Sequence, residues 1–299
     1  MPPLISILMP VYNVNRFLDV AIRSVFAQTH PDWELIVIDD ASSDGSGDFI
    51  KRIDDPRVKL LRNEQNLGLP RSVNRAIDHA TGHYMARFDG DDMLVPERLE
   101  RQLNFALANP GIDMHGTGSF STGADLELLM VWRPPTDHAQ ITRRPAWDIP
   151  VMNGAMFARS EWWRRWKHDP RTGYPGVAFE INFRCHRDSV LANIPDPLYI
   201  YRFFGNTSSW RKRTLGVYRK AQVLSRHGFR RGMVLQTLVG LASLAPRPFL
   251  YILMDLTRQN RGIVKSMSLA PTMEDRAAYT KALEVIRNTE VPLRDGVSV

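Results

Sequence analysis

The first part of the chain alternates short apolar runs with segments whose apolar residues recur at helical spacing. Apolar runs at residues 4–9, 33–38, 58–61 and 84–88 predict buried strands. Between and after them, helices are expected around 17–26, from 46 through Ile53, over 69–80, and from Pro96 through Leu99, Leu103 and Leu107. This alternation predicts an α/β domain with a mostly parallel sheet flanked by helices.

The pattern becomes less regular after residue 112. Short strands are expected at 151–157, 191–194 and 199–203, and a helix over 180–187. After Trp210 the chain becomes helical and basic. We therefore expect an α/β domain over residues 1–209 and a helical C-terminal extension over residues 210–299.

Three carboxylates crowd into four residues after one expected strand, at Asp89, Asp91 and Asp92. Like charges this close raise one another's pKa, and a hard divalent cation would relieve the repulsion. Mg²⁺ and Mn²⁺ typically take one or two carboxylates together with substrate phosphates. The run therefore predicts a metal site for a phosphorylated substrate. A solvated turn is the alternative, because Asp-Gly is also a turn signal.

Two further polar segments also follow expected strands. They are Pro10 to Asn13 and the pair Asp39 and Asp40. Ligands of parallel sheets bind beyond the carboxyl ends of the strands. We therefore expect all three segments to meet along one edge of the sheet, although about 50 residues separate successive acids.

The net charge of +7 is concentrated toward the C-terminus, where Asp255 is the lone acid between Arg202 and Lys265. Such a field attracts phosphates or anionic lipid. Apolar residues beside these cations predict a helix on a membrane surface, at Leu250, Ile252, Leu253, Met254 and Leu256. The alternative is a helix packed against the α/β domain. Nucleic-acid binding is not expected, since no reader motif is present.

Cysteine content and the first residues bear on location. Cys185 is the single cysteine, which excludes an internal disulfide, and the start of the chain lacks the basic, uninterrupted apolar pattern of a signal peptide. We expect a cytoplasmic protein, with contact at the inner face of the cell membrane as an option.

Four motifs occur in order: Ser6 to Asn13, Glu34 to Ser46, Asn66-Leu67-Gly68, and Asp89 to Asp92 followed by Pro96-Glu97-Arg98-Leu99. This set resembles the inverting glycosyltransferases of family 2. Those enzymes have a GT-A type, Rossmann-like fold and use a nucleotide-sugar donor. The resemblance covers about the first third of the chain and continues weakly from Leu198 to Ser209.

The resemblance implies roles for individual residues. Pro10, Val11 and Tyr12, with Asn13, should border the nucleotide base, and Tyr12 offers a stacking surface. Either Asp39 or Asp40 should hydrogen-bond the base or ribose. Arg71 and Asn74 are expected to face the donor. Asp89, Asp91 and Asp92 form the metal motif for Mn²⁺ or Mg²⁺, with Asp91 on the ribose or metal and Asp92 on the metal. The alternative for Tyr12 is that its ring only packs within the protein. The alternative for Arg71 and Asn74 is that they lie on a solvated helix surface.

The catalytic base is where the chain departs from the family pattern. With Arg184 set against the family's arginine, Val177 and Ala178 occupy the positions of the expected acid pair. Glu180 is the nearest acid that matches a family position, and we predict it as the base. An exposed helix carboxylate is the alternative reading, and Asp169 and Asp188 are reserves. The cluster 162–167 is either an acceptor-side loop or a helix with its tryptophans in the core.

The resemblance implies a metal-dependent inverting transfer of a sugar, from UDP as the default nucleotide, to a glycan or lipid-linked acceptor. Surface polysaccharide or glycolipid synthesis is the expected setting. A nucleotide-sugar-binding protein without a base is the alternative. Two other enzyme classes fit the sequence less well. A phosphatase would have its Asp pair after the first strand, whereas here the pair follows about the fourth. A nucleotidyltransferase would need a glycine- and basic-rich first loop, which is absent here.

Overall fold

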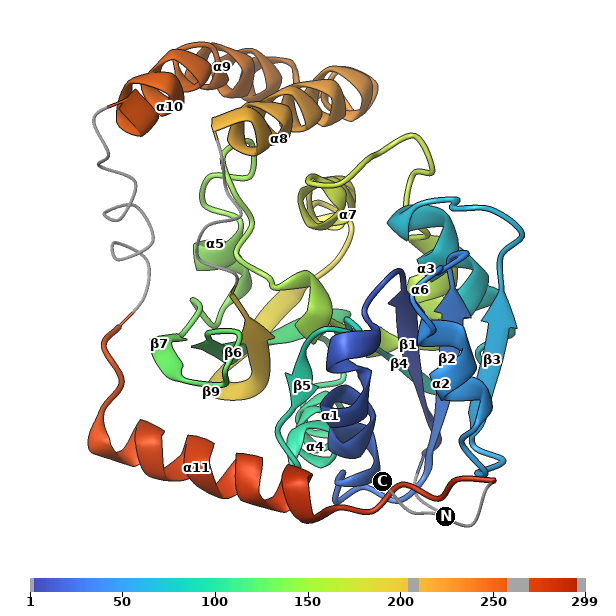
Figure 1. Ribbon diagram of the computed structural model, residues 1–299. Helices are drawn as coiled ribbons and strands as arrows, with labels where there is room; N and C mark the ends of the chain where they lie inside the picture. The colour runs from blue at the N-terminus through green and yellow to red at the C-terminus, as the bar shows by residue number, and fades with distance from the viewer. Residues whose placement is uncertain (1–2, 204–209, 257–268, 295–299) are drawn as a thin grey trace.

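The computed structural model describes residues 3–203, 210–256 and 269–294 (Figure 1). The strands of these residues form one mixed sheet in the order β3-β2-β1-β4-β8-β6-β9-β5, with β7 paired to β6. The strands are β1 (Ile5–Val11), β2 (Trp33–Asp39), β3 (Val58–Arg62), β4 (Tyr84–Arg87), β5 (Met93–Leu94), β6 (Met114–Thr122), β7 (Leu128–Trp132), β8 (Phe157–Arg159) and β9 (Leu191–Arg202).

The first four strands are parallel to one another, as the sequence pattern predicts. β1 was expected to end before Pro10, but it continues to Val11. Its pairing with β4 stops at Leu8, while Pro10 faces Ile38 on the β2 side. The proline therefore sits where only one edge of β1 is paired, and its missing N–H is tolerated there.

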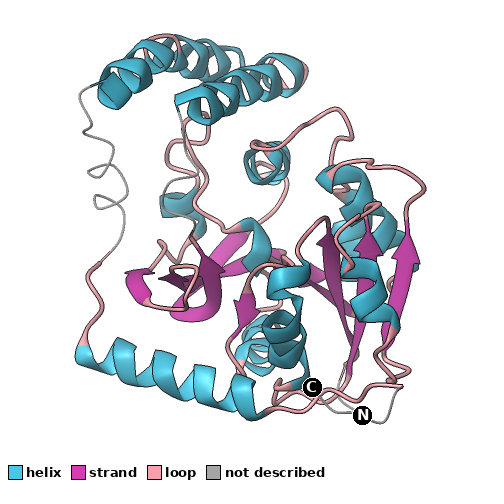
Figure 2. Cartoon of the chain, viewed as in Figure 1, coloured by secondary structure: helices cyan, strands magenta, loops and turns pink. Residues whose placement is uncertain are grey.

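Helices cover both faces of this sheet (Figure 2). The helices before the C-terminal segment are α1 (Asn15–Phe26), α2 (Ser46–Lys51), α3 (Leu69–His79), α4 (Arg98–Ala108), α5 (His138–Ile141), the 3-10 turn η1 (Asn153–Ala155), α6 (Ser160–Arg165) and α7 (Val177–Cys185). Alternate residues of β1 serve different cores: Ile7 and Met9 pack with Leu18 of α1, and Leu8 packs with Val73 of α3. The period of two along a strand explains this division.

The second part of the sheet corrects several sequence-based expectations. β6 and β7 were not predicted, since β6 is rich in Gly, Ser and Thr although every residue in it is buried. The run at 151–157 contains the turn η1 at its centre, and only Phe157 joins a strand. The two strands predicted at 191–194 and 199–203 are the single strand β9, whose prolines fall at a register shift against β6. Leu107 was expected on the apolar face of α4, but it is 54% exposed.

The C-terminal part is helical, as predicted. It comprises α8 (Trp210–Val223), the π-helical turn η2 (Leu224–Gly228), α9 (Val234–Leu244), α10 (Arg247–Leu256) and α11 (Met273–Asn288). α8, α9 and α10 form one group at the top of Figure 1, whereas α11 runs along the bottom and packs beside α1. Leu283 and Ile286 of α11 share a core with Phe120 and Ile200 of the sheet. Among the described residues, no helix is long and apolar enough to cross a membrane.

Candidate active site

Asp39 and Asp40 end β2 on the predicted edge of the sheet, but their surroundings differ. Asp40 accepts the backbone N–H groups of Leu67 and Gly68, both at 2.8 Å, and the Asn63 amide at 2.6 Å. Both of its oxygens are therefore occupied in holding the loop before α3. This assigns Asp40 a positioning role within the described structure.

The carboxylate of Asp39 is fully buried and only half used. One oxygen accepts the Ser42 N–H at 2.9 Å. The other lies 3.3 Å from Arg62 Nε but makes no hydrogen bond with any described residue. Gly47 leaves room for it, since a methyl group there would lie 2.3 Å from this oxygen. A buried acceptor without a hydrogen bond suits a ring N–H or a sugar hydroxyl, so Asp39 is the better of the two predicted base or ribose ligands.

The end of β1 and the residues after it lie between the Asp39 loop and the acidic loop, because β1 lies between β2 and β4. Tyr12 is half exposed, so its ring is open to a stacking partner. Asn13 adopts a left-handed backbone conformation and accepts the Ser43 N–H at 2.9 Å through its side chain. Gly90 approaches Val11 closely, since a methyl group on Gly90 would lie 2.8 Å from Val11 Cγ1. Pro10 to Asn13 thus link the Asp39 loop to the acidic loop.

The two residues of α3 that were expected to face the nucleotide-sugar donor differ in how far their side chains are engaged. Arg71 is exposed, with a 3.4 Å hydrogen bond to the Leu67 carbonyl oxygen. Asn74 exchanges two hydrogen bonds with the His168 backbone, at 2.8 and 2.9 Å. The Asn74 amide is therefore engaged in fixing the segment before α7.

The acidic loop after β4 is held by β9. Tyr199 Oη donates to Asp92 Oδ2 at 2.7 Å, and the Arg202 backbone N–H donates to Asp92 Oδ1 at 2.7 Å. Asp89 Oδ1 accepts from the buried Arg87 guanidinium at 2.6 Å. Sequence reasoning did not identify Tyr199, because only the fold brings β9 beside this loop. It also missed Arg87, although Arg87 is two residues before Asp89.

The carboxyl groups of Asp91 and Asp92 resist ionisation. Burial, reinforced by the negative charge of Asp89, raises the pKa of Asp91 to about 6. Burial and the charges of Asp91 and Asp89 raise the pKa of Asp92 well above its ordinary value. A cation at this loop would reverse both effects.

The three acids line a cavity of about 460 Å³. Its other walls come from η1, from β9 and from the start of α7. Gly154 is required in the η1 wall, since a methyl group there would lie 2.3 Å from Tyr199 Oη and 3.0 Å from Asp89 Oδ2. Asp39 and Asp40 do not line this cavity; they lie two strands away along the same strand-end edge.

The donor set of this cavity fits a hard divalent cation in part. Carboxylate oxygens are suitable ligands, and burial keeps the pKa of Asp91 raised although Arg87 and Arg202 carry positive charge nearby. In the described ranges, however, no group of three or more His, Cys, Asp or Glu side chains is arranged to hold a metal ion by itself. Such an arrangement fits Mn²⁺ or Mg²⁺ if a bound diphosphate completes the coordination.

The predicted base lies elsewhere. Glu180 is 0% exposed, forms an ion pair with Arg184, and lies 3.5 Å from His168 Nδ1. Burial would raise the pKa of Glu180, but the His168 ring and the Arg184 guanidinium outweigh it and lower the pKa. The cavity wall of α7 is formed instead by Val177 and Ala178. The structure therefore does not bring the Glu180 carboxylate to the acids, and the exposed-carboxylate alternative is wrong as well.

The reserve acids are also engaged. Asp169 pairs with Arg171 at 2.9 Å and with Arg226 of η2 at 3.1 Å. Asp188 pairs with Arg231. All three tryptophans of the 162–167 cluster are buried, at Trp162, Trp163 and Trp166. The core interpretation of that cluster is therefore confirmed.

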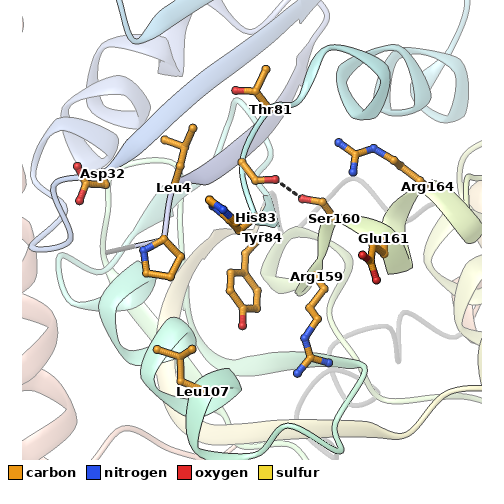
Figure 3. Close-up of a pocket in the computed structure, with 12 residues that line it drawn as sticks. Leu4, Asp32, Thr81, His83, Tyr84, Leu107, Arg159, Ser160, Glu161 and Arg164 are labelled. Carbon is orange, nitrogen blue, oxygen red and sulfur yellow. Dashed lines mark hydrogen bonds between the residues drawn. The ribbon is translucent and has the colours of Figure 1, made fainter. Parts of the chain in front are cut away.

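A second, larger hollow of about 870 Å³ lies at the opposite ends of the strands (Figure 3). Its lining includes Leu107 and the side chains of Arg159, Glu161 and Arg164, and Ser160 there donates to the Gly82 carbonyl oxygen. None of the predicted site residues lines it. Volume alone is thus a poor guide, and the acid-lined cavity is the candidate active site.

Comparison with solved structures bears on the fold. Residues of this chain superpose on S. aureus TarS 1–349 in complex with UDP-GlcNAc with a TM-score of 0.60, at 15% identity, covering 98% of this chain and 82% of that one. The chain and TarS share one α/β fold, with a mostly parallel sheet flanked by helices. The predicted fold class is confirmed.

Sequence comparison gives the family. The profile described as glycosyl transferase family 2 matches residues 6–163. An uncharacterized glycosyltransferase of Haemophilus influenzae is 30% identical over 219 residues, covering 69% of this chain and 68% of that protein. The Escherichia coli protein named UDP-Glc:alpha-D-GlcNAc-diphosphoundecaprenol beta-1,3-glucosyltransferase WfgD is 39% identical over 113 residues, covering 38% of this chain and 45% of that protein. The chain belongs to glycosyl transferase family 2, which confirms the resemblance of the motifs.

Proposed function

We propose that this chain transfers a sugar from a nucleotide-sugar donor, with UDP as the nucleotide, to a glycan or lipid-linked acceptor in cell-surface polysaccharide or glycolipid synthesis. The observation that carries the proposal is the cavity lined by Asp89, Asp91 and Asp92 at the carboxyl edge of the strands. The UDP-GlcNAc complex of TarS supports the donor class, and the name of WfgD supports a lipid-linked acceptor.

The nucleotide lies, in this proposal, over the segment after β1. Tyr12 stacks on the base, and the Asp39 oxygen that accepts no hydrogen bond within the protein accepts one from the base or ribose. Asp40 holds the loop that precedes α3, so it shapes the site without touching the nucleotide. Arg71 is exposed on that helix and is available to a phosphate.

The diphosphate lies, in this proposal, at the acidic loop. Asp91 and Asp92 hold Mn²⁺ or Mg²⁺, with Asp89 beside them. A bound cation would neutralise the negative charge that develops on the nucleotide diphosphate as it leaves. The acceptor oxygen attacks the anomeric carbon in line from the opposite side and inverts it.

Removal of the acceptor proton is the step that the described side chains leave open. A base must reach the acceptor hydroxyl within hydrogen-bond distance or through one water. Val177 and Ala178 line the cavity in the place of carboxylates, whereas the carboxylate of Glu180 is buried. These two observations favour a second candidate function, a nucleotide-sugar-binding protein with little or no turnover.

A donor screen separates the two candidates. Thermal unfolding of the full chain is followed with a panel of nucleotide sugars in Mn²⁺ and in EDTA, because a ligand that binds only the folded state raises its melting temperature. Donors that bind are then assayed for hydrolysis and for transfer to lipid-linked sugars. Metal-dependent binding with transfer supports the enzyme, binding without any turnover supports the second candidate, and failure of every nucleotide sugar to bind contradicts both.

A further inference from the structure

Helix α9 (Val234–Leu244) exposes the side of the helix that a soluble protein normally buries. Thr237, Gly240 and Leu244 face inward, and a methyl group on Gly240 would lie 2.8 Å from Ala146 Cβ. This close approach fixes α9 against the α/β domain. The outward positions are Val234, Leu235, Leu238 and Val239, and Leu235 is 75% exposed.

The outward face of α9 carries no charge. Residues 232–246 contain no Asp, Glu, Lys or Arg. A helix on a water-facing surface normally exposes charged and polar side chains opposite its apolar stripe. The neighbouring α10 packs against α9 and extends the apolar surface, with Phe249 69% exposed and Leu250 and Ile252 also exposed. The side chains of residues 253–256, where the sequence predicted further apolar contacts, lie outside the described structure.

Positive charge accompanies this apolar surface. Residues 210–254 contain nine Lys and Arg residues and no Asp or Glu. Arg211, Lys212 and Arg230 are exposed on the segments that adjoin α9 and α10. An exposed apolar surface beside cations is the composition of helices that lie in the headgroup region of anionic membranes.

We propose that the outward faces of α9 and α10 form a docking surface for an anionic lipid bilayer, on which both helices lie in the membrane plane. α9 has 11 residues and is therefore about 16 Å long, half of the hydrocarbon thickness of about 30 Å. A second copy of the chain fits this surface less well, because a symmetric contact would bring two sets of cations together. This docking surface goes beyond the proposed sugar transfer and does not depend on it.

The test is cosedimentation of the full chain with vesicles of pure phosphatidylcholine and of an equimolar mixture with phosphatidylglycerol. We expect binding to the mixed vesicles that weakens with added salt. The double variant Leu235→Gln, Leu238→Gln should bind about tenfold more weakly, because it removes two apolar side chains from the membrane contact. Lys212→Gln with Arg230→Gln should also lose about tenfold, on anionic vesicles only.

Leu107→Gln is the matched control, since Leu107 is also an exposed leucine but lies on α4. It should bind vesicles as the unmodified chain does, and the melting temperature of each variant reports whether the chain remains folded. Absence of binding to anionic vesicles would overturn the proposal. So would equal binding by the control and the α9 variant, or a concentration-dependent dimer abolished by the α9 variant without any vesicle binding.

Discussion

Tyr199 on β9 donates its hydroxyl hydrogen to Asp92 at 2.7 Å, across a sequence separation of 107 residues. The same hydroxyl accepts the Asp89 backbone N–H at 3.3 Å. One side chain of the second half of the sheet thus fixes both ends of the acidic loop.

Replacing Tyr199 by Phe should therefore loosen that loop. We expect the free energy of unfolding to fall by about 1–3 kcal/mol, since a buried carboxylate loses a hydrogen bond. The affinity for Mn²⁺ with nucleotide should fall with it. Tyr201→Phe is the control, two residues along the same strand and also lining the cavity, and should change stability by less than about 0.5 kcal/mol. Equal effects of the two substitutions in urea unfolding would contradict this role of Tyr199.

The raised pKa of Asp91 gives a pH dependence of stability. Its pKa of about 6 lies above the unfolded value of 3.8, so the folded state holds the extra proton between these values and stability falls as pH rises through them. Without metal at pH 7, Asp91→Asn should therefore be more stable than the unmodified chain by about 1–3 kcal/mol, and this difference should vanish below pH 3.8.

Urea unfolding in EDTA across this pH range measures the Asp91 effect. Asp78→Asn is the control, because its ion pair with Lys167 is exposed and should matter little at any pH. Adding Mn²⁺ with a bound nucleotide should reverse the order at pH 7, because the cation then compensates the ionised carboxylate. A variant that is never more stable than the unmodified chain would refute the argument.

Substitution by Asn should affect stability at Asp40 and nucleotide affinity at Asp39. Asp40→Asn keeps only one acceptor oxygen and turns an amide NH2 toward a donor, so at least one of the three hydrogen bonds is lost and we expect a loss of about 1–3 kcal/mol in stability. Asp39→Asn should leave stability nearly unchanged and lower nucleotide affinity about tenfold or more. Calorimetric titration with UDP and urea unfolding measure the two quantities. If Asp39→Asn binds UDP as tightly as the unmodified chain, its predicted contact with the base or ribose is wrong.

The absence of a carboxylate at position 178 can be tested by adding one. Ala178→Asp places an acid in the cavity wall and should raise turnover at least tenfold if proton removal is limiting, in proportion to what general bases contribute. Glu180→Gln tests the original prediction. If Glu180 is the base, this substitution should lower kcat far more than it lowers the affinity for the nucleotide-sugar donor.

A structural role of Glu180 would instead appear as a loss of about 3–5 kcal/mol in stability, because Arg184 would lose its buried partner. The two roles are separated by measuring kcat, donor affinity and melting temperature on the same samples. Unchanged turnover in a folded Glu180→Gln protein removes Glu180 as the base.

Sequence patterning predicted the parallel half of the sheet because β1, β2 and β4 are continuous apolar runs followed by polar segments. It missed β6, where Thr117, Ser119 and Thr122 are buried although their residue types are typical of exposed loops. It also divided β9 at Pro195 and Pro197, which a register shift accommodates. In each case a tertiary contact outweighs the local preference.

The candidate site shows the same limit. The acids could be found because each follows a strand, but their distinct roles depend on partners distant in sequence. Nothing local separates Asp39 from Asp40; they are distinguished by distant partners such as Asn63 and the loop at 67–68, which bind Asp40. Helical spacing could suggest the ion pair of Glu180 with Arg184, but not its contact with His168, which lies outside the helix.

Helix α11 changes how residues 210–256 relate to the rest of the chain. It returns to the sheet, and Leu293 beyond it pairs with Ile53 in the β1–β3 region. The basic helices are thus an insertion between two parts of one folded unit, so a fragment cut at residue 209 would expose the apolar surface that α11 covers. Excising the insertion would expose another part of the core, which Val223, Leu224 and Leu244 cover, so a minimal enzyme needs both segments.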